Sequence, residues 1–245
     1  GIMFLSTPYN IEDIDFLDSM GVKAFKVASG QVVEPDFLSH MAKKAKPIYL
    51  STGMCTLAEV YEAVEIIRKA GNDDITVLQC TANYPSAVED CNLKAMVSMG
   101  KSLNLPFGYS DHTQGLTASL VAVSLGACVI ERHFTLDKTL PGPDQSSSSD
   151  PVEFSMLTRQ IREVERSLGS LVKRPTAVEA ENARGMRRSI VARVDIKEGE
   201  ILTRDKLAMK RPGTGLLGNQ MQLVLGRTTK QDIFADTLLT LDMLR

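Results

Sequence analysis

The chain has 245 residues, of which 43% are hydrophobic and 24% are charged, and its formal net charge is -2. This composition is typical of a soluble globular protein with enough apolar side chains for a substantial core. Its 28 basic residues are scattered, which argues against a nucleic-acid partner, and its longest apolar stretch, about 118–130, is too short to cross a membrane.

Six short apolar runs, each ending in a small polar or ionisable residue, predict six β-strands. They cover residues 2–7, 24–29, 47–52, 75–81, 106–112 and 128–133. Amphipathic segments such as 57–70 separate these runs, and repeated alternation of strand and helix is typical of a parallel sheet covered by helices. Six strands with polar C-terminal ends favour a (β/α)8 TIM barrel without its first two β/α units, although periodicity alone is also compatible with an open sheet.

The remaining segments predict a loop, a helix and a second domain. Residues 137–149 are rich in Pro, Gly and Ser and predict a loop over the strand ends, and Asp150, Pro151 and Glu153 then form a capping box that starts a helix. The polar segment 173–186 predicts a linker. It divides a partial barrel domain at 1–172 from a small β-rich domain at 187–245, which is expected to have little core of its own.

Two histidines close two successive predicted strands, His112 after the fifth and His133 after the sixth. Side chains at the ends of adjacent parallel strands point into one crevice, where the active sites of these folds lie. The pair could hold one divalent cation, such as Mn²⁺, Co²⁺, Fe²⁺ or Zn²⁺, through neutral imidazole nitrogens. The alternative is that both are polar residues that merely end strands.

The four cysteines lack the spacing of a metal knuckle, and Cys80 and Cys128 lie in apolar runs. A reduced, buried thiol is the ordinary interpretation of such residues, so we expect a reducing, cytoplasmic compartment.

The chain also enters an apolar run directly from Gly1, and we expect it to be a truncated form that is poorly active by itself.

Nine motifs occur in the order in which they are found in the sialic acid synthases. They are STPY at 6–9, FKVASG at 25–30, LSTGM at 50–54, CTANYP at 80–85, GYSDHT at 108–113, ERHFTLD at 131–137, PGPD at 141–144, RRS at 187–189 and KRPGTG at 210–215. The chain therefore resembles the N-acetylneuraminate, legionaminate and pseudaminate synthases over nearly its whole length. The last two motifs resemble the antifreeze-like (SAF) domain that ends these enzymes.

The resemblance implies a TIM barrel followed by a SAF domain. It implies a condensation of phosphoenolpyruvate with an N-acetylated hexosamine, N-acetylmannosamine or a related dideoxy sugar, which gives a nine-carbon 2-keto acid and phosphate. It also implies a divalent metal on His112 and His133, with Mn²⁺ first and Co²⁺ or Mg²⁺ as alternatives. A domain-swapped homodimer is implied as well, in which the SAF domain covers the partner's barrel.

Phosphoenolpyruvate carries a carboxylate and a phosphate, so its site needs a cation and several hydrogen-bond donors. Four residues near predicted strand ends, Lys26, Ser29, Ser51 and Ser110, could supply them, and the resemblance assigns the phosphate to this group. A lysine within an apolar run favours this hypothesis, because its burial is costly without an anion. The alternative for each serine is that it only ends a strand.

The resemblance supplies the remaining site residues. It assigns Thr7 to the phosphoenolpyruvate carboxylate, Tyr84 to the sugar, and Asp144 to the sugar and metal region, where it could handle a proton. Arg211 of the second domain would reach the N-acyl group across the dimer. Without the resemblance, Tyr84 would be a packing residue, Asp144 a turn residue and Arg211 a surface residue.

Two positions depart from the family pattern. Gln31 stands where the family has a carboxylate for proton transfer, and Gln145 stands where it has a histidine. Glutamine keeps the shape but is not a general base. Gln31 therefore keeps open a catalytically impaired sugar-binding relative. A metal-dependent aldolase or hydrolase on a TIM barrel also stays open, because metals on strand-end histidines serve many reactions.

Overall fold

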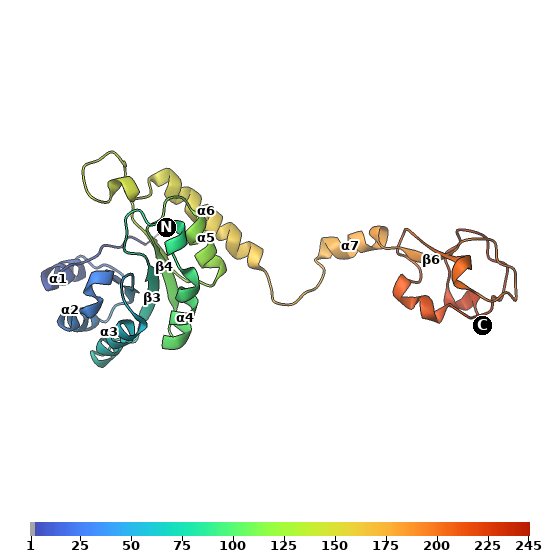
Figure 1. Cartoon of the computed structure of the whole chain (residues 1–245), viewed down its shortest axis with the longest axis horizontal. Coiled ribbons are helices and arrows are strands. Elements are labelled where there is room, and N and C mark those ends of the chain that lie inside the picture. The colour runs from blue at the N-terminus through green and yellow to red at the C-terminus, as the bar shows by residue number, and fades with distance from the viewer. Residues whose placement is uncertain (1–2) are drawn as a thin grey trace. The chain divides into compact units, whose positions relative to one another are not determined.

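The structure, a computed structural model, describes residues 3–245 and contains two compact units, Gly1–Gly169 and Ser170–Arg245. The first unit is built on one curled sheet of five parallel strands, with helices along its outside (Figure 1). In chain order the sheet consists of β1 (Phe25–Val27), β2 (Ile48–Ser51), β3 (Ile75–Cys80), β4 (Phe107–Asp111) and β5 (Ile130–Arg132). The α/β class with a parallel sheet is therefore confirmed, as a half-barrel.

The helices of the first unit alternate with the strands. They are α1 (Ile11–Ser19), α2 (Pro35–Ala42), α3 (Leu57–Lys69), α4 (Leu93–Leu103), α5 (Thr117–Ser124) and α6 (Pro151–Leu168), with 3₁₀ turns η1 (Ser29–Val33), η2 (Val88–Asp90) and η3 (Gln145–Ser147). The predicted capping box of α6 is present, since Asp150 accepts hydrogen bonds from the Val152 and Glu153 amides. Such a cap stabilises a helix by about 1 kcal/mol.

The first predicted strand, 2–7, is wrong. Residues 3–7 have no regular secondary structure, and residue 2 lies outside the described residues. A strand exists only through the ladder of hydrogen bonds to a neighbour, and the apolar side chains that suggested one are on the surface, Phe4 being 76% exposed. The other five predicted strands are present.

Alternation along the strands decides which side chains reach the site. Ile48 and Leu50 of β2 pack into the apolar core beneath the helices, as do Ile75 and Val77 of β3. Residues one position away, such as Ser51, point to the inner face of the sheet instead. Gly108 allows close packing here, because a Cβ atom at this position would lie 2.3 Å from the Val129 carbonyl oxygen.

The second unit contains an antiparallel pair, β6 (Ser189–Ala192) and β7 (Leu207–Lys210), and three 3₁₀ turns, η4 (Arg204–Lys206), η5 (Gly218–Leu223) and η6 (Leu241–Met243). Contrary to expectation, it has an apolar core of its own, which includes Ile190, Val224 and Leu239.

The segment 173–186, expected to be a linker, contains helix α7 (Ala177–Met186). Thr176 and Glu179 form a reciprocal capping box at its start, and none of its residues is buried. A helix without a buried side lacks the regular apolar stripe from which helices are predicted. Over the described part of the chain, no helix has both the length and the apolar character needed to cross a membrane.

Candidate active site

A buried ion pair lies on the inner face of the sheet. The Lys26 ammonium of β1 is 2.9 Å from Glu131 Oε2 of β5, and the Ser110 hydroxyl of β4 donates to the same oxygen over 2.6 Å. Lys26 is 5% exposed and Ser110 is fully buried. Because β1 and β5 are the two outer strands of the five, this contact spans the concave face of the curled sheet.

Glu131 is ionised in this environment. Burial alone would raise the pKa of its carboxyl, but the charge of Lys26 and the hydrogen bonds from Ser110 and Lys26 lower it to about 2. The site therefore holds a fixed positive and a fixed negative charge at neutral pH. An anionic ligand of Lys26 would compete with this carboxylate.

Two more predicted serines lie beside this pair. Ser29 begins η1, and its hydroxyl accepts a hydrogen bond from the Gly53 amide over 2.8 Å. Ser51 ends β2, and its hydroxyl is buried with no hydrogen-bond partner among the described residues. A buried hydroxyl without a hydrogen-bond partner lowers the stability of the fold. A bound ligand could supply the missing partner for Ser51.

Cys80, the last residue of β3, connects the two halves of the site. Its thiol contacts the hydroxyls of Ser29 and Ser110, and its Sγ atom lies 3.7 Å from His112 Nδ1. Burial raises the pKa of this thiol, so it is neutral at physiological pH.

The two histidines lie side by side, as predicted, directly after β4 and β5. Their ring centroids are 5.1 Å apart, and the planes are nearly perpendicular. His112 Nδ1 is 2.8 Å from the Thr81 carbonyl oxygen, an acceptor, so Nδ1 carries the proton and Nε2 keeps its lone pair. Burial lowers the pKa of His112 and favours this neutral form.

Two predicted sugar-side residues lie next to the histidines. Asp144 Oδ2 is 3.2 Å from His133 Nδ1, and the Tyr84 ring centroid is 4.1 Å from that of His112 and 5.3 Å from that of His133. Burial raises the pKa of Tyr84 to about 12, so its hydroxyl is a hydrogen-bond donor at neutral pH. The site thus places an aromatic hydroxyl, a carboxylate and two imidazoles together.

The donor set can be compared with what a metal ion needs. Within residues 3–245, no group of three or more His, Cys, Asp or Glu side chains is arranged to hold a metal ion. The two neighbouring imidazoles of His112 and His133 nevertheless fit a metal site in which water or substrate supplies the remaining ligands. The His112 Nδ1 atom is bound to a carbonyl oxygen, which leaves its Nε2 atom free for a metal.

The structure does not join three predicted residues to this cluster. Thr7 is half-buried in the irregular segment before α1, and Gln31 lies in η1, where its Oε1 atom is buried and has no partner in the described part of the chain. Arg211 belongs to the second unit, where its Nε donates to the Met186 carbonyl oxygen. The roles expected for these three residues stay predictions.

The sequence analysis missed two members of the cluster, Glu131 and Cys80. The signal for Glu131 was a carboxylate in a predicted strand of the same sheet as the buried Lys26, which needs a partner. Cys80 was correctly expected to be buried, but its place between the serines and His112 depends on pairing across the sheet. Cys128, also expected to be buried, is exposed because its apolar run lies at the edge of the sheet.

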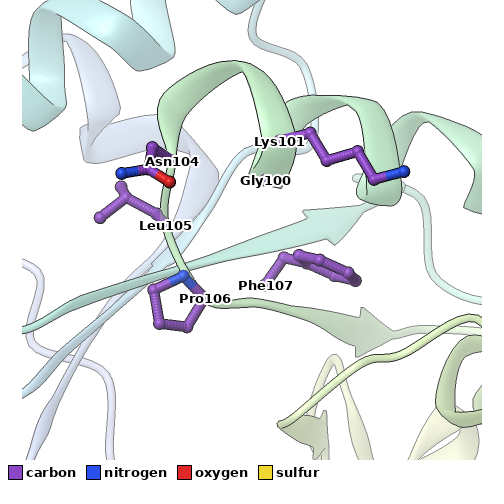
Figure 2. A pocket seen from close by; sticks show the side chains of 6 residues that line it. All are labelled: Gly100, Lys101, Asn104, Leu105, Pro106 and Phe107. Carbon is purple, nitrogen blue, oxygen red and sulfur yellow. The ribbon is translucent and has the colours of Figure 1, made fainter.

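A shallow pocket of about 360 Å³ lies elsewhere, where α4 ends and β4 begins. Figure 2 shows Phe107 beneath the helical turn that carries Gly100, with Asn104, Leu105 and Pro106 on the connection. The pocket is at the N-terminal end of β4, whereas Ser110 and His112 are at and beyond its C-terminal end. It lies apart from the charged cluster.

The chain is similar to known proteins over nearly its whole length. The NeuB family profile matches residues 1–173, and the SAF domain profile matches residues 187–245. The chain is 43% identical to N,N'-diacetyllegionaminic acid synthase from Campylobacter jejuni, over 97% of this chain and 72% of the relative. It is 39% identical to pseudaminic acid synthase from the same species, over 97% of this chain and 69% of that one.

A solved structure supports the same relationship. N-acetylneuraminic acid (sialic acid) synthetase from Leptospira borgpetersenii superposes with a TM-score of 0.68 at 32% identity, over 74% of this chain and 63% of that chain. The chain therefore belongs to the NeuB family and carries a C-terminal SAF domain. The resemblance to sialic acid synthases drawn from nine sequence motifs is confirmed.

Proposed function

We propose that this protein condenses phosphoenolpyruvate with an N-acetylated hexosamine, N-acetylmannosamine or a related dideoxy sugar, to give a nine-carbon sialic-type 2-keto acid and phosphate. The observation that carries the proposal is one continuous cluster, which joins a buried lysine and serines to a pair of histidines through Cys80. Relatives named as legionaminic and pseudaminic acid synthases support this reaction class.

Phosphoenolpyruvate would occupy the lysine end of the cluster. The Lys26 ammonium would neutralise the phosphate, and the hydroxyls of Ser29 and Ser51 would donate to its oxygens. The Ser110 hydroxyl would also donate to the phosphate, after turning away from Glu131. The unpaired Ser51 hydroxyl is the clearest candidate, since binding would give it a partner. Thr7 is proposed to contact the carboxylate of the same substrate.

The open-chain sugar would lie at the histidine end. The Tyr84 hydroxyl, a donor at neutral pH, would bind a sugar oxygen, and Asp144 would hold or move the proton of the hydroxyl that forms. His112 and His133 would hold a divalent cation, with Mn²⁺ the first choice and Co²⁺ or Mg²⁺ the alternatives. When bound, that cation would polarise the sugar aldehyde.

The bond changes follow from the two substrates. The C3 atom of phosphoenolpyruvate forms a bond to the aldehyde carbon, which becomes an alcohol, and C2 becomes electron-deficient. Water adds to C2, and the tetrahedral intermediate expels phosphate with cleavage of the C–O bond, which leaves the 2-keto acid. Glu131 is held ionised chiefly by the charge of Lys26, and its negative charge would stabilise positive charge at C2.

The second domain would complete the site of another copy. We propose a domain-swapped homodimer in which Arg211 donates to the N-acyl oxygen of the sugar bound by the partner's first unit. An Arg211→Ala variant would then raise the KM for the sugar, while the KM for phosphoenolpyruvate stays unchanged.

Mass spectrometry of the products tests the proposal. The purified protein is incubated with Mn²⁺, phosphoenolpyruvate and a panel of N-acetylated hexosamines, and we expect a nine-carbon acid, formed slowly by this chain, only when both substrates are present. Phosphate release without a sugar would indicate a hydrolase, and reaction of a sugar without phosphoenolpyruvate would indicate an aldolase. Chelation of the metal should stop product formation, and comparison of added Mn²⁺, Co²⁺ and Mg²⁺ identifies the effective cation.

Gln31 favours a second candidate, a sugar-binding relative with impaired catalysis. Its Oε1 atom is buried without a partner in residues 3–245, at a position where the sialic acid synthases resembled by this chain carry a carboxylate. A Gln31→Glu variant decides between the two candidates. A large gain in product rate over a nearly inactive parent would support the impaired relative, whereas an active parent with no gain would exclude it.

A further inference from the structure

A second polar cluster lies on the outer face of the strands that lead to the histidines. Asp111 of β4 and Arg132 of β5 are register partners, and Arg132 Nη1 lies 2.9 Å from Asp111 Oδ2. Their side chains are 0% and 5% exposed. The Ser119 hydroxyl of α5 donates to the same carboxylate over 2.5 Å, which places the pair between the sheet and its helical cover. None of the chemistry proposed above uses this pair.

The polar groups of the pair have several partners each. Arg132 also donates through Nε to the Ser149 hydroxyl over 2.5 Å and through Nη2 to the Thr113 carbonyl oxygen over 2.6 Å. Asp111 Oδ1 accepts from both the amide and the hydroxyl of Thr113, each at 2.8 Å. A buried network that satisfies its members in this way is rigid.

The network binds the backbone at or directly beside each histidine. Asp111 precedes His112 and Thr113 follows it, and the two are hydrogen-bonded to each other. Arg132 precedes His133, and the Ser149 amide donates to the His133 carbonyl oxygen over 2.8 Å. The two histidine backbones are therefore held to one guanidinium group, through Thr113 on one side and Ser149 on the other.

We propose that Asp111 and Arg132 are positioning residues that fix the separation of the His112 and His133 rings. A guanidinium group is planar and donates in fixed directions, so bonds to three residues set their relative positions. Buried ion pairs add little stability compared with apolar residues of the same size, which makes geometry the better reason for this one. The expected effect on catalysis rests on the proposed function, whereas the effect on the histidine positions does not.

Nuclear magnetic resonance of ¹⁵N-labelled histidine tests the positioning without any ligand. The chain has three histidines, and His40, which pairs with Asp15 on the surface, is an internal reference. An Arg132→Lys variant keeps the charge but loses the planar set of donors. We expect its His112 and His133 ring signals to shift or broaden while the His40 signals stay unchanged. Unchanged His112 and His133 signals in the folded variant would overturn the proposal.

A matched control separates positioning from a general loss of stability. Val64→Ala leaves a cavity in the core under α3, away from the histidines, and the two variants are compared at equal distance below their melting temperatures. Shifts of the same two histidine signals in Val64→Ala would refute the proposal. If Arg132→Lys does not fold, Ser149→Ala removes only one bond of the guanidinium. It should perturb His133, and an unperturbed His133 would contradict the proposal.

Enzyme kinetics of the Arg132→Lys variant test the expected effect on catalysis. Misplacing reacting groups by about 1 Å costs about 100-fold in rate, so Arg132→Lys should lower kcat by 10- to 100-fold. The KM for phosphoenolpyruvate should change less than about threefold, because other residues bind it. An unchanged kcat would refute the catalytic consequence. If the parent forms no product, the proposed function fails, while the histidine signals still decide the positioning.

Discussion

The Lys26–Glu131 pair gives a quantitative prediction for the Glu131→Gln variant. The pKa of the Glu131 carboxyl falls from 4.5 to about 2 in the folded protein, a lowering of about 2.5 pH units. At about 1.4 kcal/mol for each unit, the ionised side chain contributes about 3 kcal/mol to the free energy of unfolding at pH 7. The range of 3–5 kcal/mol typical of breaking a buried pair from one side agrees with this estimate.

The pH dependence of this contribution has a definite sign. A carboxyl with a lowered folded-state pKa stabilises the protein fully above its unfolded-state pKa, here 4.5. The contribution declines as the pH falls from about 4.5 through the folded-state pKa of about 2. About 2 of the 3 kcal/mol should therefore be lost between pH 7 and pH 3.

Urea unfolding followed by circular dichroism measures this effect in both proteins at pH 7 and pH 3. Both proteins carry the same second unit, so its contribution cancels in the difference. We expect Glu131→Gln to be less stable by about 3 kcal/mol at pH 7 and by about 1 kcal/mol at pH 3. A difference that does not change with pH would refute the assignment of Glu131 as the ionised partner of Lys26.

Three further predictions follow from single side chains. Ser51→Ala removes an unpaired buried hydroxyl, so the melting temperature should be unchanged or higher, while the KM for phosphoenolpyruvate rises. Gly108→Ala places a Cβ atom against the Val129 carbonyl oxygen, and chemical denaturation should show a free energy of unfolding lower by about 3 kcal/mol, the upper end of the range for overpacking. Because the pKa of Tyr84 is raised to about 12, Tyr84→Phe should leave the phenolate absorbance that develops by pH 11 unchanged, and a decrease would contradict the assigned environment.

The sequence predicted the part of the site that follows from strand order. His112 and His133 end successive parallel strands, and adjacent strands of a parallel sheet end at the same edge, so their proximity did not depend on tertiary detail. Ser110 lies two residues before His112, and period-two alternation brings it to the same face. These residues were predictable because local pattern and connectivity determine them.

Other features depended on interactions that no local pattern contains. The partner of Lys26 is 105 residues away in sequence, and its identity follows from the curl of the sheet, which brings β1 and β5 together. Residues 3–7 have the apolar composition of a strand but no ladder partner, and α7 is a helix with no buried face. In each case the structure was determined by tertiary contacts, or by their absence among the described residues, and local amino-acid composition did not predict it.

The two faces of β4 and β5 have different roles in the site: the inner face carries groups that would meet substrate, and the outer face carries groups that hold the backbone. Ser110 and Glu131 form one register pair and face inward to the charges that would meet substrate. Asp111 and Arg132, one residue further along, form the next register pair and face outward to the helices, where their bonds fix the backbone. A one-residue shift in register would exchange the two faces and bury the wrong charges. The same alternation that buries the core therefore requires the reactive groups and their supports to occur as adjacent pairs in sequence.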